Sequence, residues 1–276
     1  MGATNASSAR SYLFVPGDRL DRLAKALSTT ADIIIVDLED AVAAESKLRA
    51  RETIAAASFP RARVMVRING WGTPWIEGDL DVMRTLGVSA VMVPKAEEAS
   101  EIERIASRLG PAVPIVALIE SALGVWQALD VARAPGVSRL AFGSLDFAED
   151  AGTSLDADAL LYARSRLVLA SRVANLPQPI DGVTIETNDV AAVQRDARTG
   201  QRLGFGAKLC IHPSQTDAVN AVFMPADEEV AWARAVLAAV ERSGGAAVKL
   251  DGRMIDLPVI KRATRIARLS RNHAAR

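Results

Sequence analysis

Short runs of apolar, largely β-branched residues alternate along the chain with longer stretches in which apolar residues recur at helical spacing. Eight of the short runs predict strands, over residues 11–15, 33–37, 63–68, 90–93, 114–119, 139–142, 179–183 and 207–211. The longer stretches predict helices over residues 20–27, 44–57, 78–86, 99–109, 125–134, 157–175 and 190–203. Such alternation of strand and helix is typical of a parallel sheet built from βα units.

Eight strands followed by helices are most economically arranged as a closed barrel, because closure removes the exposed edges of an open sheet. The alternative is a doubly wound open sheet, which would normally carry a glycine-rich phosphate turn after its first strand. Here the first strand runs into Pro16-Gly17-Asp18-Arg19, and Gly204-Phe205-Gly206 precedes a strand instead of following one. We therefore predict an α/β protein with a (β/α)8 TIM-barrel fold.

The last 50 or so residues lie beyond the eighth predicted strand and carry a separate helical pattern. A helix is expected from about 227 to 243, then a short extended stretch, then a helix from about 257 to 269. We predict a catalytic barrel over residues 1–222 and a C-terminal helical extension over 223–276. The extension is expected to form an oligomer contact and to cover an active site.

Composition narrows the classes of protein that fit this pattern. The chain has 276 residues, of which 50% are apolar, 4% aromatic and 24% charged, a balance that supports a large aliphatic core and excludes a disordered chain. Lys and Arg total 33, as do Asp and Glu, so no net charge draws the protein to nucleic acid or to an anionic membrane. With one cysteine and no apolar signal or membrane segment, we expect a cytoplasmic protein.

Polar residues follow most of the predicted strands at the end where TIM barrels carry their active sites. The candidates are Asp37, Glu39 and Asp40 after the second strand, and then Arg67, Lys95, Glu120, Asp146 and His212. Cys210 and His212 share a strand face, but Cys210 lies in an apolar run and no third group orients the pair, so a nucleophilic role is disfavoured.

Glu120 and Asp146 follow adjacent strands, so their carboxylates should converge at one end of the barrel. They would repel each other unless a cation or a proton lay between them. With two histidines and one cysteine in the chain, an oxygen-ligated Mg²⁺ fits better than zinc. The alternative is that Glu120 caps the helix that begins near Leu123 and that Asp146 caps a turn.

Arg67 shares a face with Met65, opposite Val64 and Val66, and its guanidinium would point into the mouth of the barrel. There it could bind a substrate carboxylate, while Asp37 and Glu39 could orient it or hold metal-bound waters. It could equally be a structural partner of those two acids.

Seven segments occur in a fixed order along the chain: Arg10-Ser11-Tyr12-Leu13-Phe14-Val15-Pro16-Gly17, Asp37-Leu38-Glu39-Asp40-Ala41-Val42, Arg67-Ile68-Asn69-Gly70 with Thr73-Pro74-Trp75, Val93-Pro94-Lys95, Ile119-Glu120-Ser121-Ala122-Leu123-Gly124-Val125, Gly143-Ser144-Leu145-Asp146 and Lys208-Leu209-Cys210-Ile211-His212-Pro213. Taken together, these segments resemble the citrate lyase beta subunit and malyl-coenzyme A lyase group of the HpcH/HpaI aldolase family. The segments span nearly the whole chain.

The resemblance implies a Mg²⁺-dependent lyase that cleaves a 3-hydroxyacyl-coenzyme A of the malyl or citramalyl type into an acyl-coenzyme A and a 2-oxo acid. It implies that Glu120 and Asp146 hold the metal and that Arg67 stabilises the oxygen that becomes a carbonyl. It also implies that Asp256, in the segment Gly252-Arg253-Met254-Ile255-Asp256, is an acid/base contributed by the extension of a neighbouring subunit of a homotrimer or homohexamer.

The resemblance leaves two other activities open. One is a thioesterase for malyl-coenzyme A, and the other is the beta subunit of a multi-subunit citrate lyase. Many relatives carry Glu where this chain has Leu145, so the substrate can differ from theirs. Arg19 and Lys95 are the candidate residues for binding the coenzyme A portion, although Arg19 could simply belong to a solvated helix face.

Overall fold

The computed structural model describes residues 8–242, 248–250 and 253–274 of the chain. These residues fall into two compact units, one that ends at residue 223 and one that begins at residue 224. Among the described helices, none is long and apolar enough to cross a membrane.

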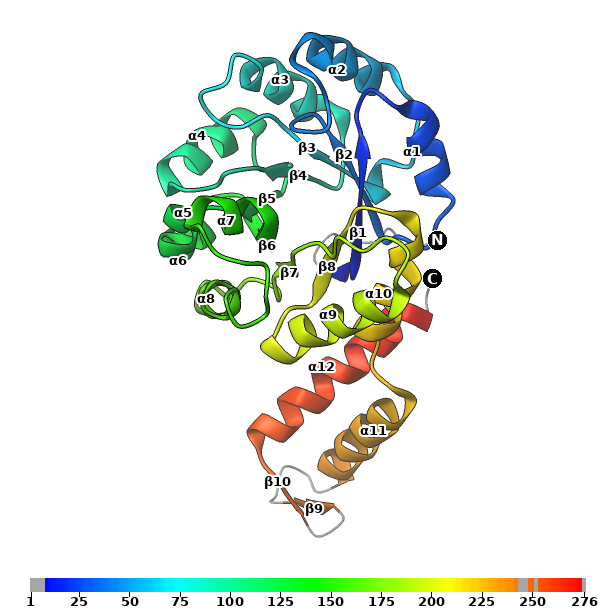
Figure 1. Ribbon diagram of the computed structural model, residues 1–276. Coiled ribbons are helices and arrows are strands. Elements are labelled where there is room, and N and C mark those ends of the chain that lie inside the picture. The colour runs from blue at the N-terminus through cyan, green and yellow to red at the C-terminus, as the bar shows by residue number, and fades with distance from the viewer. Residues whose placement is uncertain (1–7, 243–247, 251–252, 275–276) are drawn as a thin grey trace. The chain divides into compact units, whose positions relative to one another are not determined.

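The first unit is a closed barrel of eight parallel strands, β1 to β8, in sequence order (Figure 1). The strands are Ser11–Pro16, Ile33–Asp37, Val64–Arg67, Ala90–Val93, Ile115–Ile119, Val137–Phe142, Ile180–Asp181 and Ala207–Cys210. β1 pairs with both β2 and β8, which closes the sheet on itself. The predicted TIM-barrel fold is therefore confirmed.

Helices connect consecutive strands and surround the barrel (Figure 1). They are α1 Leu20–Leu27, α2 Lys47–Ala56, α3 Ile76–Leu86, α4 Ala99–Leu109, α5 Ala122–Trp126, α6 Ala128–Arg133, α7 Ser144–Ala151, α8 Leu161–Val173, α9 Val190–Leu203 and α10 Thr216–Phe223. The single helix expected over 125–134 is two helices, because Gln127 leaves the α conformation between them. The hydrophobic pattern did not predict the short helices α7 and α10.

The strand β7 is much shorter than the predicted run over 179–183. Beyond it, the carbonyl oxygen of Gly182 accepts a hydrogen bond from Lys208 Nζ at 2.6 Å instead of continuing the ladder between strands. Asp181 likewise faces outward and binds Arg164 Nε at 3.0 Å. Buried side-chain partners therefore replace the strand pairing that the apolar pattern suggests.

Alternate residues of each strand pack into two separate cores, as expected when both faces of a sheet are covered. One core fills the barrel and contains Tyr12, Ile33, Ile35, Met65, Met92, Val116, Leu118 and Leu209 among its members. The other lies between strands and helices and contains Ile34, Val36, Val64, Val66 and many helix residues. The predicted division of Met65 from Val64 and Val66 is confirmed. Asp37, Arg67 and Glu120 continue the inward-facing series at the ends of their strands.

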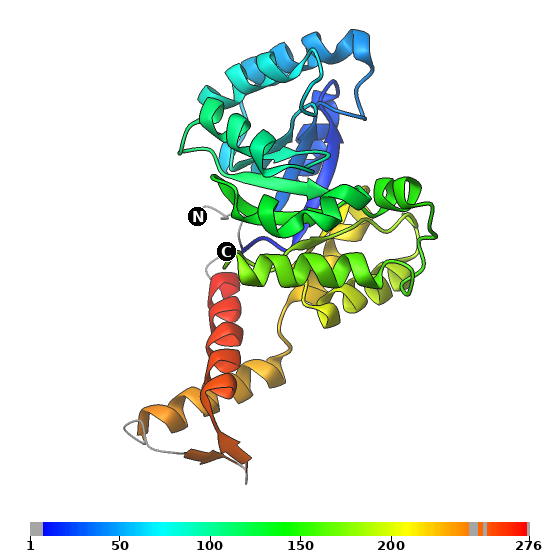
Figure 2. The ribbon, with the colours of Figure 1, turned by 90° about the vertical axis from the view of Figure 1, so that its left-hand side faces the viewer.

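The second unit consists of two helices and a two-stranded antiparallel sheet (Figure 2). The elements are α11 Asp227–Arg242, β9 Val248–Leu250, β10 Arg253–Ile255 and α12 Leu257–Ala274. Its own small core holds Ala233, Val236, Ala239, Ile255, Ala263 and Ile266. The last helix is longer than the apolar pattern predicted.

Candidate functional site

Arg67 and Asp37 form a buried, two-pronged ion pair at the ends of β3 and β2. Arg67 Nε donates to Asp37 Oδ1 at 2.8 Å and Nη2 donates to Oδ2 at 2.6 Å. The two residues are partners in the strand register, and both side chains point inward. Strand alternation and pairing alone thus bring them together.

Asp37 also fixes the loop that follows β2. Its two carboxylate oxygens accept hydrogen bonds from the backbone N–H groups of Glu39, at 2.9 Å, and Ala41, at 3.2 Å. Four hydrogen bonds therefore converge on one carboxylate that is 2% exposed. The Asp37-Leu38-Glu39-Asp40 segment is held as a rigid acidic turn against Arg67.

Two further acids of this turn surround the guanidinium of Arg67. Arg67 Nη1 lies 3.0 Å from Glu39 Oε2 and 3.5 Å from Asp40 Oδ2, and the ring of Phe14 lies below the guanidinium, 5.1 Å from Cζ. Burial lowers the pKa of Arg67, but the hydrogen bonds of Asp37 and the negative charges of Asp37 and Glu39 outweigh it, so the pKa is raised. Arg67 is therefore a permanent cation whose orientation is fixed by its contacts with Asp37 and Glu39.

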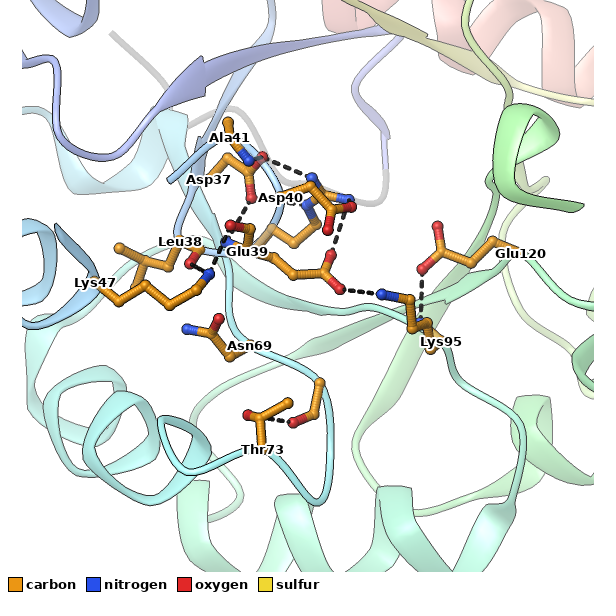
Figure 3. Close-up of polar contacts among 12 residues, drawn as sticks. Asp37, Leu38, Glu39, Asp40, Ala41, Lys47, Asn69, Thr73, Lys95 and Glu120 are labelled. Atoms are coloured by element: carbon orange, nitrogen blue, oxygen red, sulfur yellow. Dashed lines mark hydrogen bonds and ion pairs between the residues drawn. The ribbon is translucent and has the colours of Figure 1, made fainter. Parts of the chain in front are cut away.

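Lys95 connects this cluster to the fifth strand (Figure 3). Lys95 Nζ donates to Glu39 Oε1 at 2.9 Å, and the Lys95 backbone N–H donates to Glu120 Oε1 at 2.8 Å. The hydrogen bond to Glu39, followed by smaller charge effects, raises the pKa of Lys95, so its amine is protonated.

Glu120 is a buried carboxyl group, 3% exposed, at the end of β5. Burial raises its pKa well above the ordinary value, and the negative charges of Glu39 and Asp146 raise it further, while the Lys95 N–H opposes them. A side chain at Gly143, at the end of β6, would place its Cβ 2.5 Å from Glu120 Oε2, so glycine is required for this approach. Asp146 follows in the first turn of α7 and is half-buried.

The structure gives the capping role suggested for Glu120 to other residues. Ser121 is the N-cap of α5, and its Oγ accepts from the N–H of Gly124 at 3.0 Å. Asp150 Oδ2 accepts from the N–H of Ala122 at 2.7 Å. Because these two residues accept hydrogen bonds from the backbone N–H groups at the start of α5, Glu120 is not needed as a helix cap.

The donor set at this end of the barrel fits Mg²⁺. Glu120 and Asp146 follow adjacent strands, and burial disfavours the anionic form of Glu120, which a bound cation would favour. Within the part of the chain that the structure describes, no three His, Cys, Asp or Glu side chains gather as a metal site. Magnesium is commonly bound by one or two carboxylates, with water and substrate oxygens as its other ligands, so two suffice.

Two other sequence-predicted residues, Arg19 and Asp256, make their side-chain hydrogen bonds outside this cluster. Arg19 binds Asp21 through Nε at 2.9 Å and Nη2 at 2.8 Å, exposed at the start of α1. Asp256 belongs to the second unit, where its exposed Oδ1 accepts from the N–H of Val259 at 3.1 Å and caps α12. The Cys210 thiol is fully buried and burial raises its pKa to about 12, so it is not a nucleophile.

Lys47 is part of the site but was not predicted. It is 7% exposed, and Nζ donates to the carbonyl oxygens of Leu38 at 2.8 Å and Glu39 at 2.7 Å, with the Trp75 ring 5.0 Å away. It thus holds the acidic turn from behind. A lysine at the start of a helix normally faces solvent, so nothing local in the sequence marks it.

Leu145, the departure noted in the sequence, lies beside a cavity of about 410 Å³. The cavity is lined by parts of α7, α8, α9 and the segment after β7, including Ser144, Leu155, Arg164, Ile185 and Asp196. Leu145 is 39% exposed, so the cavity presents an apolar side chain at this edge.

Comparison with known proteins identifies a family and several relatives that are similar to this chain. The model of the HpcH/HpaI aldolase/citrate lyase family matches residues 10–213. A citrate lyase subunit beta-like protein of Deinococcus radiodurans is 38% identical over 92% of this chain and 94% of its own length. A (3S)-malyl-CoA thioesterase of Cereibacter sphaeroides is 33% identical over 90% of this chain and 89% of its own.

Solved structures are also similar to this chain in fold and in sequence. The protein CitE from Mycobacterium tuberculosis, in complex with magnesium, acetoacetate and coenzyme A, is similar with a TM-score of 0.80 and 34% identity. The match covers 96% of this chain and 99% of that one. Structural neighbours are thus complexed with magnesium.

Proposed function

Because the chain belongs to the HpcH/HpaI aldolase/citrate lyase family, we propose that it is a Mg²⁺-dependent carbon–carbon lyase. Its substrate would be a 3-hydroxyacyl-coenzyme A of the malyl or citramalyl type, and its products an acyl-coenzyme A and a 2-oxo acid. The observation that carries the proposal is the buried Glu120 carboxyl, which is linked through Lys95 and Glu39 to the Arg67 cluster.

Glu120 and Asp146 are the residues that would hold the metal, each through a carboxylate oxygen. When bound there, Mg²⁺ would supply Lewis-acid polarisation of the substrate oxygen that becomes the carbonyl. The neighbour that contains magnesium, acetoacetate and coenzyme A supports this choice of metal and of ligand class.

Arg67 would grip the substrate carboxylate or the oxygen on which charge changes, because it is a fixed cation at the same end of the barrel. Asp37 and Glu39 hold its guanidinium in one orientation. In the cleavage direction, the hydroxyl would give its proton to the carboxylate of the acid/base residue, Asp256, as the bond between the hydroxyl-bearing carbon and the thioester α-carbon breaks. The electron pair passes to the thioester as an enolate, which then takes a proton at carbon.

We assign that proton to Asp256 of a neighbouring copy, which makes each active site composite and requires an oligomer, for which a homotrimer or homohexamer is our proposal. Asp256 is exposed and sits at the start of α12, where its second oxygen can face a ligand. Arg19 and Lys95, with side chains 46% and 57% exposed, are the candidate contacts for the coenzyme A portion.

The thioesterase relative supports a second candidate activity, hydrolysis of malyl-coenzyme A at the same metal site. A beta subunit acting on a carrier thioester is the third. A screen of malyl-, citramalyl- and methylmalyl-thioesters with Mg²⁺, with all products identified, separates them. A lyase releases a 2-oxo acid and an acyl thioester in equal amounts. Release of free thiol and a hydroxy acid would establish the thioesterase instead.

A further inference from the structure

Lys95 adopts a backbone conformation that few residues with a side chain adopt. It follows β4 and Pro94, and its φ is +48°, in the left-handed region. Among the residues that the structure describes, Asn175 is the other non-glycine residue with a positive φ. Asparagine tolerates that region better than most residues, but lysine has no such tolerance, and unfavourable backbone conformations of this kind concentrate at functional sites.

The conformation of Lys95 directs its backbone N–H toward Glu120. The N–H donates to Glu120 Oε1 at 2.8 Å, and the next residue, Ala96, donates to the carbonyl oxygen of Leu118 at 3.1 Å. The turn after β4 is thereby fastened to the end of β5. One oxygen of the buried Glu120 carboxyl, Oε1, is fixed by this hydrogen bond, and the other, Oε2, lies on the side of Gly143.

The side chain of Lys95 extends in another direction, to Glu39. Nζ donates to Glu39 Oε1 at 2.9 Å (Figure 3). The other oxygen of Glu39, Oε2, lies 3.0 Å from Arg67 Nη1. Glu39 therefore lies between two cations. Arg67, Glu39, Lys95 and Glu120 form one continuous chain of contacts across the end of the barrel.

We propose that Lys95 is a positioning residue that fixes Glu120 through its backbone and Glu39 through its ammonium group. It would join the metal-binding carboxyl group to the arginine that grips the substrate. The two functions are separable, since one depends on φ and the other on charge. The metal part rests on the proposed function, whereas the backbone contact with Glu120 can be tested without metal.

Two variants of similar size separate the backbone from the side chain. Lys95→Asn and Lys95→Val both remove the ammonium group, but asparagine tolerates a positive φ and a β-branched residue does not. We expect Mg²⁺ binding, measured by calorimetry with MgCl₂, to stay within about threefold of wild type in Lys95→Asn and to weaken about tenfold or more in Lys95→Val, the range seen for partners of metal ligands.

Amide hydrogen exchange provides the readout without metal. The residue-95 amide should exchange slowly in the wild type and in Lys95→Asn, and about tenfold faster or more in Lys95→Val. Equal exchange and equal Mg²⁺ affinity in the two variants, with both folded by circular dichroism, would overturn the backbone role. A wild type that binds no Mg²⁺ would refute the metal site, and the exchange comparison would still decide the role of Lys95.

The ammonium function is tested by activity and by rescue. Lys95→Asn should lower kcat about tenfold, because Glu39 and hence Arg67 lose one fixed neighbour, and Lys95→Arg should restore most of it. A role confined to binding coenzyme A phosphates would instead raise KM and leave kcat unchanged. That result, or a Lys95→Arg variant no better than Lys95→Asn, would overturn the proposed hold on Glu39.

Discussion

Replacing Arg67 with lysine keeps the charge of the site but removes the two-pronged geometry. The matched control is Arg10→Lys, because Arg10 binds Asp32 through Nε at 3.0 Å and Nη2 at 3.2 Å at the other end of the barrel. The exposed fractions of the side chains are nearly the same, 10% and 4% for Arg10 and Asp32 against 10% and 3% for Arg67 and Asp37.

The size of the effect follows from the hydrogen bonds. An ammonium group can replace one prong of each fork, so each variant loses a charge-assisted hydrogen bond worth about 1.5 to 3 kcal/mol. A loss of about 2 kcal/mol in the free energy of unfolding lowers Tm by about 4 to 8 °C in a domain of this size. Arg67→Lys also loosens Glu39, so its Tm should fall at least as far as that of Arg10→Lys.

Kinetics distinguish the two arginines. If Arg67 grips the substrate, Arg67→Lys should lower kcat/KM about 100-fold, since about 2.7 kcal/mol of transition-state binding corresponds to two factors of ten. Arg10→Lys should leave kcat/KM within about threefold of wild type at a temperature where both variants are folded. Equal kcat/KM in both variants, with equal losses of Tm, would assign Arg67 a structural role alone.

Three other predictions concern separate parts of the molecule. Glu120→Gln should weaken Mg²⁺ binding, measured by calorimetry, about 100-fold or more. It should not lower the Tm of the metal-free protein, because the neutral amide avoids the burial of a charge. Unchanged affinity would place the metal elsewhere. Asp256→Asn should abolish turnover but not Mg²⁺ binding. Mixing Asp256→Asn subunits with Glu120→Gln subunits should restore activity. No recovery after verified subunit exchange would exclude a composite site. Cys210 should resist iodoacetamide at pH 8 in the folded protein and react in denaturant, because its pKa is raised to about 12; equal labelling in both states would show that the thiol is accessible.

The barrel could be predicted from the sequence because its strands are covered on both faces and read as apolar runs. β2 and β5 are such runs, and their predicted positions agree with the structure to within a residue. β7 could not be predicted correctly, because its partners are the buried side chains of Arg164 and Lys208, which are distant in the sequence from Asp181.

The candidate site likewise contains residues that the sequence could predict and residues that it could not. Asp37, Arg67 and Glu120 could be placed at one end of the barrel because strand alternation and strand ends determine where they point. Lys47 was missed because it becomes buried by contacts with the carbonyls of Leu38 and Glu39, which no local pattern records. The left-handed backbone conformation of Lys95 could not be predicted from the sequence either, because it depends on how the turn after β4 contacts β5.

The most direct test of the proposed active site is a crystal structure of the protein with Mg²⁺ and a 2-oxo acid bound. We predict that one carboxylate oxygen from Glu120 and one from Asp146 lie about 2.0 to 2.1 Å from the metal. Arg67 should contact the carboxylate or the 2-oxo oxygen of the ligand while still held by Asp37. Magnesium bound elsewhere, or a ligand that contacts neither the metal nor Arg67, would contradict the proposed active site.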